Sequence, residues 1–198
     1  VPVLGRSCLV TDEPNLTRVA TTKTSVDIDR IQVAAAVTNG ETLLRLDANG
    51  GWSPDEALKV LTAVSDTEIE LIEEPTRDPS EWREISTRTG LKVGADEQLT
   101  DRLQIDRILE LEAAQTFVLK PSVLGGPEST RQLASRAQDH NVRVLISSLL
   151  EGPIGLRTAR DLAIELAPQE IHGLGTAALF IEDLPEDVSP INGRIFRR

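Results

Sequence analysis

Short apolar runs alternate with longer segments of helical periodicity along the whole chain. Runs rich in β-branched and apolar residues predict buried strands, and apolar positions spaced three and four apart predict helices between them. The clearest predicted strands are residues 42–48, 69–74, 92–97, 116–121 and 143–148, with residues 17–23 as a sixth. The pattern therefore predicts a succession of strand–helix units.

Helix start signals lie in the gaps between these predicted strands. Asp, Ser or Gly before the first helical turn, followed by Pro or an acidic residue, is typical of a helix N-terminus. The four signals are Ser53-Pro54, Asp78-Pro79, Thr100-Asp101 and Gly126-Pro127. No linker rich in Pro, Ser or Gly separates one half from the other, so we expect a single domain over residues 1–198. Residues 180–198 are interpreted as a C-terminal tail across its surface, with no chemistry assigned.

The spacing of the strands predicts the fold class. One strand recurs about every two dozen residues, and eight such units require roughly 190 residues, so we expect an α/β fold of the (β/α)8 TIM-barrel type. Residues 7–10 would be the first strand and 172–176 a weak eighth. Residues 11–15 are too short for a crossover helix, so the first βα unit is expected to be irregular or incomplete. An open doubly wound sheet is the alternative, but no Gly-x-Gly-x-x-Gly follows the first strand.

Composition and charge narrow the possible partners. The 198 residues are 39% hydrophobic and carry a formal charge of −11, which disfavours binding to nucleic acid or to an anionic membrane. A small-molecule partner is therefore expected. Cys8 is the single cysteine, and no apolar run is long enough to span a membrane or to serve as a signal sequence. These features favour a soluble protein of a reducing compartment such as the cytoplasm, and they do not indicate an oligomeric state.

Ionisable residues stand at the ends of five predicted strands. They recur about every two dozen residues, in step with the βα repeat, as Lys23, Asp47, Glu73, Asp96 and Lys120. Strands buried in a parallel barrel are normally apolar, so charged residues at their ends are informative. In a barrel all five would lie at the carboxyl-terminal rim, which carries the active site in this fold.

The three carboxylates predict a metal site. Asp47, Glu73 and Asp96 on adjacent strands would repel one another unless a cation lay between them. Oxygen ligands favour Mg²⁺, with Mn²⁺ as the second choice, whereas zinc prefers His or Cys, and the two histidines, His140 and His172, are not at well-defined strand ends. The alternative is that each acid is an ordinary capping or surface residue; three in register favour the metal.

The two lysines suit proton transfer beside such a metal. Nearby positive charge and partial burial lower the pKa of a lysine towards neutrality, and a metal-held carboxylate has a more acidic α-proton. Lys120 follows an apolar run and precedes Pro121, which disfavours an ordinary surface lysine. Lys23 stands in a polar segment, where a surface role is a stronger alternative.

Motifs at these strand ends resemble those of a known family. They are Asp47-Ala48-Asn49-Gly50-Gly51-Trp52, Glu73-Glu74-Pro75, Asp96-Glu97, Lys120-Pro121-Ser122 with Gly125-Gly126, and Ser147-Ser148 with Glu151 and Gly155. Together they resemble the barrel domain of the enolase superfamily, within it the muconate-lactonizing subgroup, and most of all the o-succinylbenzoate synthases. The resemblance extends from about residue 18 to residue 179, which is most of the chain.

The resemblance implies a mechanism and a set of site residues. Asp47, Glu73 and Asp96 would be the metal ligands, Lys23 the base, and Lys120 a cation that stabilises the enediolate. The expected reaction is the Mg²⁺-dependent dehydration of a succinyl-hydroxycyclohexadiene carboxylate in menaquinone or phylloquinone biosynthesis. The resemblance also implies substrate contacts, which are expected at Asn49, Ser147, Ser148 and Gly173.

Two departures from the family pattern keep alternatives open. Thr21 stands where the family has the first lysine of its Lys-x-Lys motif, so the tuning of Lys23 is expected to differ. The sequence also begins at the barrel, without the N-terminal capping domain that the family carries. A catalytically impaired barrel or fragment is one alternative. An N-acylamino acid racemase or a cycloisomerase that uses the same two lysines and three carboxylates is the other.

Overall fold

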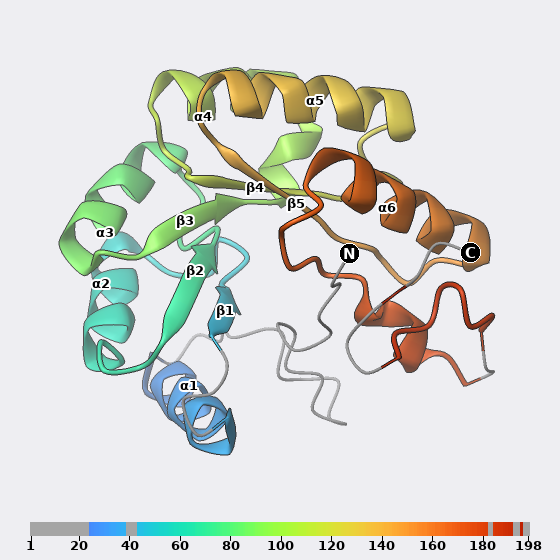
Figure 1. Ribbon diagram of the computed structural model, residues 1–198. Helices are drawn as coiled ribbons and strands as arrows, with labels where there is room; N and C mark the ends of the chain where they lie inside the picture. The colour runs from blue at the N-terminus through green and yellow to red at the C-terminus, as the bar shows by residue number, and fades with distance from the viewer. Residues whose placement is uncertain (1–23, 39–42, 182–183, 192–194, 196–198) are drawn as a thin grey trace. The chain divides into compact units, whose positions relative to one another are not determined.

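The computed structural model describes residues 24–38, 43–181, 184–191 and 195, which divide into two compact units (Figure 1). One unit ends at Gln115, and the other contains the chain from Thr116 onwards. The predicted strands 7–10 and 17–23 lie outside the described residues, and so does Cys8. Among the described residues, no helix has the length and apolar character needed to cross a membrane.

Three parallel strands form the sheet of the first unit. They are β1 (Leu44–Asp47), β2 (Ile69–Glu73) and β3 (Lys92–Ala95), in that order, which confirms three predicted strands with shorter carboxyl ends. The register is irregular between Leu44 and Arg45, where the Arg45 guanidinium binds the Glu70 carboxylate through two bonds of 2.7 and 3.1 Å. Beyond this point the strands stay in register to their carboxyl ends.

The helices of the first unit are α1 (Thr24–Thr38), α2 (Pro54–Ala63), α3 (Trp82–Thr89) and α4 (Arg102–Glu110), with 3₁₀ turns η1 (Pro79–Glu81) and η2 (Glu97–Thr100). Three helical segments of the first unit, α2, η1 and α4, begin where the sequence signals predict, whereas no signal was assigned to the start of α1. Ser53 and Glu56 form a capping box at α2, and the Asp78 and Asp101 side chains accept backbone N–H groups at η1 and α4. The starts of α2, η1 and α4 are therefore fixed by local side-chain contacts.

Apolar residues of the strands and of the helices that follow them form the core of the first unit. Leu44 and Leu46 of β1 are buried, as are Ala57, Val60 and Leu61 on one face of α2. Trp82 and Ile85 of α3 are also fully buried, and the Trp82 indole N–H donates to the Thr76 carbonyl at 2.9 Å. Leu44 and Leu46 of β1 face the helices. Because side chains alternate between the two faces of a strand, Arg45 and Asp47 lie on the opposite face of the sheet.

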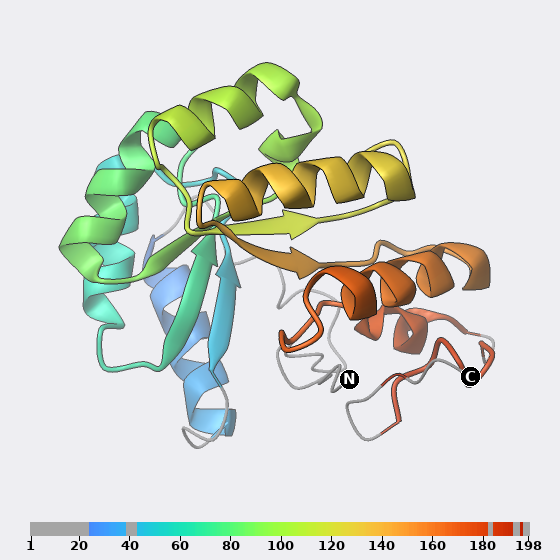
Figure 2. The ribbon, with the colours of Figure 1, turned by 45° about the horizontal axis from the view of Figure 1, so that its top comes forward.

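The second unit contains two further parallel strands and their helices. β4 (Thr116–Leu119) pairs with β5 (Arg143–Ile146) from Thr116 opposite Arg143 to Leu119 opposite Ile146. Helices α5 (Pro127–Asp139) and α6 (Pro153–Leu166) lie along this strand pair (Figure 2). The predicted α5 start at Gly126-Pro127 is confirmed.

The predicted eighth strand, residues 172–176, is wrong. Only Gly173 makes a β-bridge, to Ser147, and the 3₁₀ helix η3 (Gly175–Leu179) begins two residues later. The segment contains two glycines, Gly173 and Gly175, and one β-branched residue, Thr176, a composition that disfavours an extended strand.

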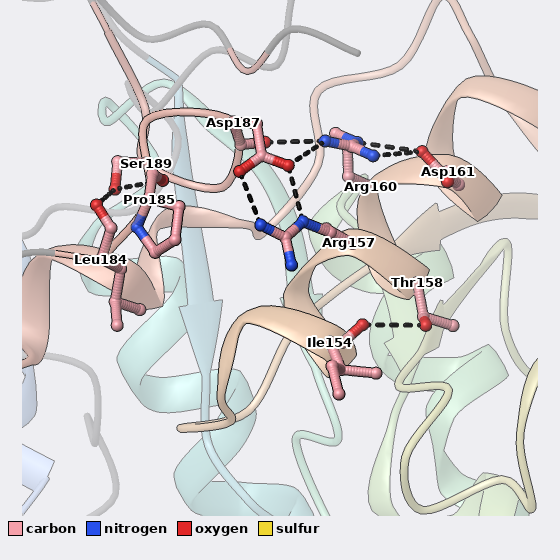
Figure 3. A network of polar contacts seen from close by, with 9 residues as sticks. All are labelled: Ile154, Arg157, Thr158, Arg160, Asp161, Leu184, Pro185, Asp187 and Ser189. Atoms are coloured by element: carbon pink, nitrogen blue, oxygen red, sulfur yellow. Dashed lines mark hydrogen bonds and ion pairs between the residues drawn. The ribbon is translucent and has the colours of Figure 1, made fainter. Parts of the chain in front are cut away.

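The tail beyond residue 180 packs against α6. Val188 is buried with Leu156 and Ala177. The Asp187 carboxylate accepts two bonds from Arg157, at 2.6 and 3.0 Å, and Arg160 donates to the Asp187 carbonyl at 2.8 Å (Figure 3). These bonds, first of all those from Arg157, lower the pKa of Asp187 from 3.8 to about 2. Residues 184–189 of the tail are thus packed against α6 in the second unit.

Candidate metal and substrate site

Two of the predicted metal ligands lie side by side at the ends of neighbouring strands. Asp47 is the last residue of β1 and Glu73 the last of β2, and the two are direct partners in the parallel register. Residues that pair directly across a parallel ladder extend their side chains on the same face. The strands therefore place both carboxylates on one face of the sheet, opposite the core face.

Gly94 provides the space that directs Glu73 towards the third strand. Glu73 pairs with Gly94 of β3, and a Cβ atom added at Gly94 would lie 3.2 Å from the Glu73 Cγ and 3.2 Å from the Leu71 Cδ1. Such contacts are tighter than ordinary van der Waals packing. The Glu73 side chain thus lies over Gly94, two residues before Asp96.

Asp96 is the third predicted ligand and follows β3 directly. It is 5% exposed and precedes the 3₁₀ turn η2. Its side chain does not cap that turn, although an aspartate at this position usually does. The backbone amides of Asp96 and Gln98 are instead bound by the Glu74 carboxylate, at 3.0 and 2.9 Å.

Glu74 is a functional candidate to which sequence reasoning assigned no role. Its side chain is buried and its backbone adopts φ 41°, which is unusual for a residue other than glycine. Burial raises the pKa of Glu74, and the amide bonds from Gln98 and Asp96 oppose that shift. Its position in the Glu73-Glu74-Pro75 motif, immediately after a strand end, was the available signal.

The loop after β1 holds the Asp47 carboxylate through its own backbone. The Asn49 amide N–H donates to the Asp47 Oδ1 at 3.0 Å, and Asn49 has φ 48°. Gly50 follows with φ 65°, and a Cβ there would lie 2.9 Å from the Arg77 Cγ, so a side chain is doubly disfavoured. Asn49, predicted to contact substrate, is therefore placed beside Asp47 by a turn that requires glycine next to it.

The described residues contain no cluster of three or more His, Cys, Asp or Glu side chains in metal-binding geometry. What the structure shows is the arrangement of the backbone that carries the carboxylates: two in direct register, and a third two residues beyond the glycine over which Glu73 lies. All donors at these three positions are carboxylate oxygens, which suit Mg²⁺ or Mn²⁺. The residues therefore fit a hard divalent cation in their chemistry and in their strand positions.

Lys23, the predicted base, lies outside the described residues, as does Thr21. Helix α1 begins at the next residue, Thr24. Within α1, the fully buried Asp27 carboxylate accepts the Trp52 indole N–H at 2.9 Å. The helix that follows Lys23 is therefore bound to the loop that follows Asp47.

Lys120 belongs to the second unit and lies directly after β4. Its side chain is half-buried, and its carbonyl accepts the backbone N–H groups of Val123 and Leu124 at 3.1 and 3.2 Å. Gly125 and Gly126 complete this turn with φ 88° and 99°, values that favour glycine. The glycines of the Lys120 motif are thus explained by the turn that leads into α5.

The predicted substrate residues of the second unit are brought together at the end of β5. The hydroxyls of Ser147 and Ser148 both donate to the Gly173 carbonyl at 3.3 Å, and the hydroxyls of Ser148 and Thr176 are 2.8 Å apart. A Cβ at Gly173 would lie 2.8 Å from the Ser147 Oγ. Glycine at 173 therefore leaves room for a cluster of hydroxyl groups at this strand end.

The rest of the Ser-Ser motif is also explained by packing. The Glu151 carboxylate accepts the Leu149 amide N–H at 3.1 Å. A Cβ at Gly155, in the first turn of α6, would come within 3.0 Å of the Glu151 Cγ. The Glu151 side chain thus binds the loop after β5 and packs against Gly155, where a larger residue would clash with it.

His172 has a structural role. It is 1% exposed, its Nδ1 lies 3.0 Å from the Ile146 amide N–H, and its Nε2 lies 2.9 Å from the Ala167 carbonyl. The first bond makes Nδ1 an acceptor, so the ring proton is on Nε2 and donates to Ala167. Both ring nitrogens of His172 are therefore occupied by bonds to the backbone.

Comparison with known proteins identifies the family. The model of the "Enolase C-terminal domain-like" family matches residues 15–195. The chain is 32% identical over 172 residues to the o-succinylbenzoate synthase of Mycobacterium ulcerans (strain Agy99), covering 85% of the chain and 50% of that protein. It is 31% identical over 170 residues to that of Mycolicibacterium smegmatis, covering 84% and 51%. The chain thus spans about half the length of the curated relatives it matches.

Solved structures share the fold. The L-Ala-D/L-Glu epimerase of Bacillus subtilis superposes with a TM-score of 0.77 at 24% identity, over 83% of this chain and 47% of that one. The N-succinyl Arg/Lys racemase of Bacillus cereus gives 0.74 at 23% identity, over 82% and 45%. These similarities confirm the α/β fold of the enolase-superfamily barrels. With a family model matched over nearly all of its length, the chain belongs to the enolase superfamily.

Proposed function

We propose that the protein is a divalent-metal-dependent lyase that dehydrates a small carboxylate, in the manner of the o-succinylbenzoate synthases. Several curated relatives with that name support the reaction class. The substrate would be a succinyl-hydroxycyclohexadiene carboxylate. Loss of water from this ring breaks one C–H and one C–O bond and leaves an aromatic product.

The arrangement of Asp47, Glu73 and Gly94 is the observation that carries the proposal. Two carboxylates pair directly across the strand ends, and one of them extends over a glycine towards the strand end that carries Asp96. Asp47, Glu73 and Asp96 would hold Mg²⁺ or Mn²⁺. When bound, the cation would supply positive charge to the substrate carboxylate and so favour loss of the proton next to it.

The two lysines divide the proton chemistry in this proposal. The Lys23 amine would remove the α-proton, and the resulting ammonium would return a proton to the departing β-hydroxyl, which leaves as water. Lys120 would stay charged and stabilise the negative charge that develops on the substrate. Its position directly after β4, at the start of the turn closed by Gly125 and Gly126, supports a fixed role.

Ser147, Ser148 and Gly173 would contact the carboxylate-bearing side chain of the substrate. A hydroxyl of Ser147 or Ser148 would then donate to that carboxylate in place of the Gly173 carbonyl. Asn49 would contact the substrate beside Asp47.

A racemase, an epimerase or a cycloisomerase is the second candidate. Solved structures with those activities in their names superpose well on the chain, including the muconate lactonizing enzyme of Pseudomonas putida with a TM-score of 0.74 at 21% identity. The same residues would serve, with both lysines exchanging protons in a racemase. At this identity the structures establish the fold and leave the reaction to experiment.

The discriminating experiment is turnover in D₂O with Mg²⁺ present. The proposal predicts formation of the aromatic product from the cyclohexadiene substrate, followed by ultraviolet absorbance. Deuterium accumulating at the α-carbon of a recovered N-acylamino acid, without dehydration, would identify the racemase instead. Tight Mg²⁺ binding with neither reaction would overturn both and identify a catalytically impaired barrel.

A further inference from the structure

We propose that Glu74 is a positioning residue that holds Asp96 in place for the metal and ties together the ends of the three strands that carry the carboxylates. The inference rests on the proposed metal-binding function and extends it to a residue outside the ligand set.

The Glu74 carboxylate takes over the capping role next to Asp96. Its Oε1 accepts the amide N–H groups of Asp96 and Gln98, at 3.0 and 2.9 Å. An aspartate that precedes a helical turn normally accepts the second of these amides with its own side chain. Because Glu74 occupies that amide, the Asp96 carboxylate is not committed to capping η2. Glu74 thereby fixes the Asp96 backbone, and the Asp96 side chain does not cap η2.

The backbone of Glu74 binds the neighbouring strand ends as well. Its N–H donates to the Gly94 carbonyl at 3.0 Å, and its carbonyl accepts the Gly50 N–H at 2.7 Å. Gly50 belongs to the loop after Asp47, and Gly94 is the glycine over which Glu73 lies. One residue therefore contacts the chain just beyond or beside each of the three candidate ligands.

The backbone conformation of Glu74 is an unfavourable one that the surrounding hydrogen bonds stabilise. The residue has φ 41°, a region that side-chain-bearing residues rarely adopt. Such a conformation persists where the surrounding bonds determine it, and it clusters at functional sites. With its side chain 4% exposed and turned to the amides, Glu74 acts as a support for the ligand-bearing backbone.

Three substitutions separate geometry from charge. Glu74→Gln keeps a carbonyl oxygen at the same reach and removes the charge. Glu74→Asp keeps the charge but is one methylene too short to reach both amides. Glu74→Gly removes the side chain and favours positive φ, so it deletes the carboxylate without adding backbone strain. Glu110→Gln, at the exposed end of α4, is the control for loss of one negative charge.

The first measurement is hydrogen exchange of the Asp96 and Gln98 amides in the metal-free protein. We expect exchange on the order of tenfold faster in Glu74→Gly and Glu74→Asp, and close to wild type in Glu74→Gln and Glu110→Gln. The second is Mg²⁺ affinity by calorimetry, with circular dichroism to confirm folding. Affinity should fall about 10- to 100-fold in Glu74→Gly and Glu74→Asp, and much less in Glu74→Gln.

Each outcome decides a specific claim. Unchanged exchange in Glu74→Gly would overturn the inference whatever the metal does. Equal loss of Mg²⁺ affinity in Glu74→Gln and Glu74→Gly would overturn it too, because charge and not position would then be the cause. A wild-type protein that binds no Mg²⁺ would instead contradict the proposed function, and the exchange of the two amides would still decide whether Glu74 orders the Asp96 segment.

Discussion

The side chain of Glu73 lies over Gly94, its direct partner on the next strand. A Cβ at Gly94 would come within 3.2 Å of the Glu73 Cγ, so the absence of a side chain on β3 gives Glu73 its path towards Asp96. Glu73 of the Glu73-Glu74-Pro75 motif is therefore packed against a glycine that belongs to none of the motifs.

Gly94→Ala should weaken Mg²⁺ binding and lower stability. The added methyl group would press on the Glu73 and Leu71 side chains, so we expect a loss in affinity on the order of tenfold and a loss in stability of about 1–3 kcal/mol. Calorimetry and urea denaturation measure the two effects. Gly152→Ala is the control, since a Cβ there meets nothing within 4 Å; an equal response in both variants would contradict the packing argument.

Lys120 and Lys23 should respond differently to substitution if the protein is a dehydratase. Lys23→Ala should abolish turnover, a loss of at least about 10²-fold. Lys120→Arg keeps the positive charge and should retain more activity than Lys120→Ala, because the role assigned to Lys120 is electrostatic. Steady-state rates with matched Mg²⁺ occupancy test this order. If Lys120→Arg were the less active variant, Lys120 would be a proton-transfer group, as in the racemase.

Thr21→Lys should raise the rate at neutral pH. Side chains two residues apart on a strand lie on the same side, so an ammonium at position 21 would favour the neutral, basic form of Lys23. We expect low wild-type activity with an alkaline optimum, and a rising limb displaced to lower pH in the variant. The measurement is the pH dependence of kcat/KM. An unchanged profile at full metal occupancy would show that position 21 does not tune the base.

Asp187→Asn should loosen the C-terminal tail in a pH-dependent way. The Arg157 guanidinium lowers the pKa of Asp187 from 3.8 to about 2, so the charged carboxylate contributes stability above pH 3.8. That contribution is lost as the pH falls through about 2. Wild type should therefore be the more stable protein at pH 7, and the difference in the free energy of unfolding should shrink between these two pH values.

The control for this prediction is Asp66→Asn, at an exposed aspartate in the turn after α2. It should show no such convergence with wild type on acidification. If Asp187→Asn were as stable as wild type at pH 7, the bonds of the Asp187 carboxylate drawn in Figure 3 would contribute nothing to the docking of the tail.

The strands and helix starts were predictable because their signals are local. The apolar runs that became β1 to β5 are continuous in sequence, and Ser53, Asp78 and Asp101 cap the helical turns that follow them at once. The predicted strand ends extended one or more residues too far. The sequence around Asp96 does not show whether this residue is the last of a strand or, as in the structure, precedes a 3₁₀ turn.

Features that depend on distant contacts were not predictable from the pattern. In the sequence, Glu74 is only one of the two acidic residues of a motif. Its bonds to the Asp96 and Gln98 amides depend on the pairing of β2 with β3, which the local sequence does not indicate. The tail was interpreted as a surface segment because residues 181–190 are acidic and contain proline, and residues 194–198 are basic. In the fold, Asp187 meets Arg157, thirty residues earlier, and Val188 enters the core. Such pairs leave no local periodicity.

The central claim is that Asp47, Glu73 and Asp96 together hold one divalent cation, and Mg²⁺ titration by calorimetry tests it most directly. Wild type, Asp47→Asn, Glu73→Gln and Asp96→Asn would be compared, because each amide keeps the shape of the side chain and removes its charge. We predict one Mg²⁺ per chain in wild type and a loss of affinity of at least about 100-fold in each variant, larger than the loss of a supporting residue. Equal affinity in wild type and all three variants would contradict the account.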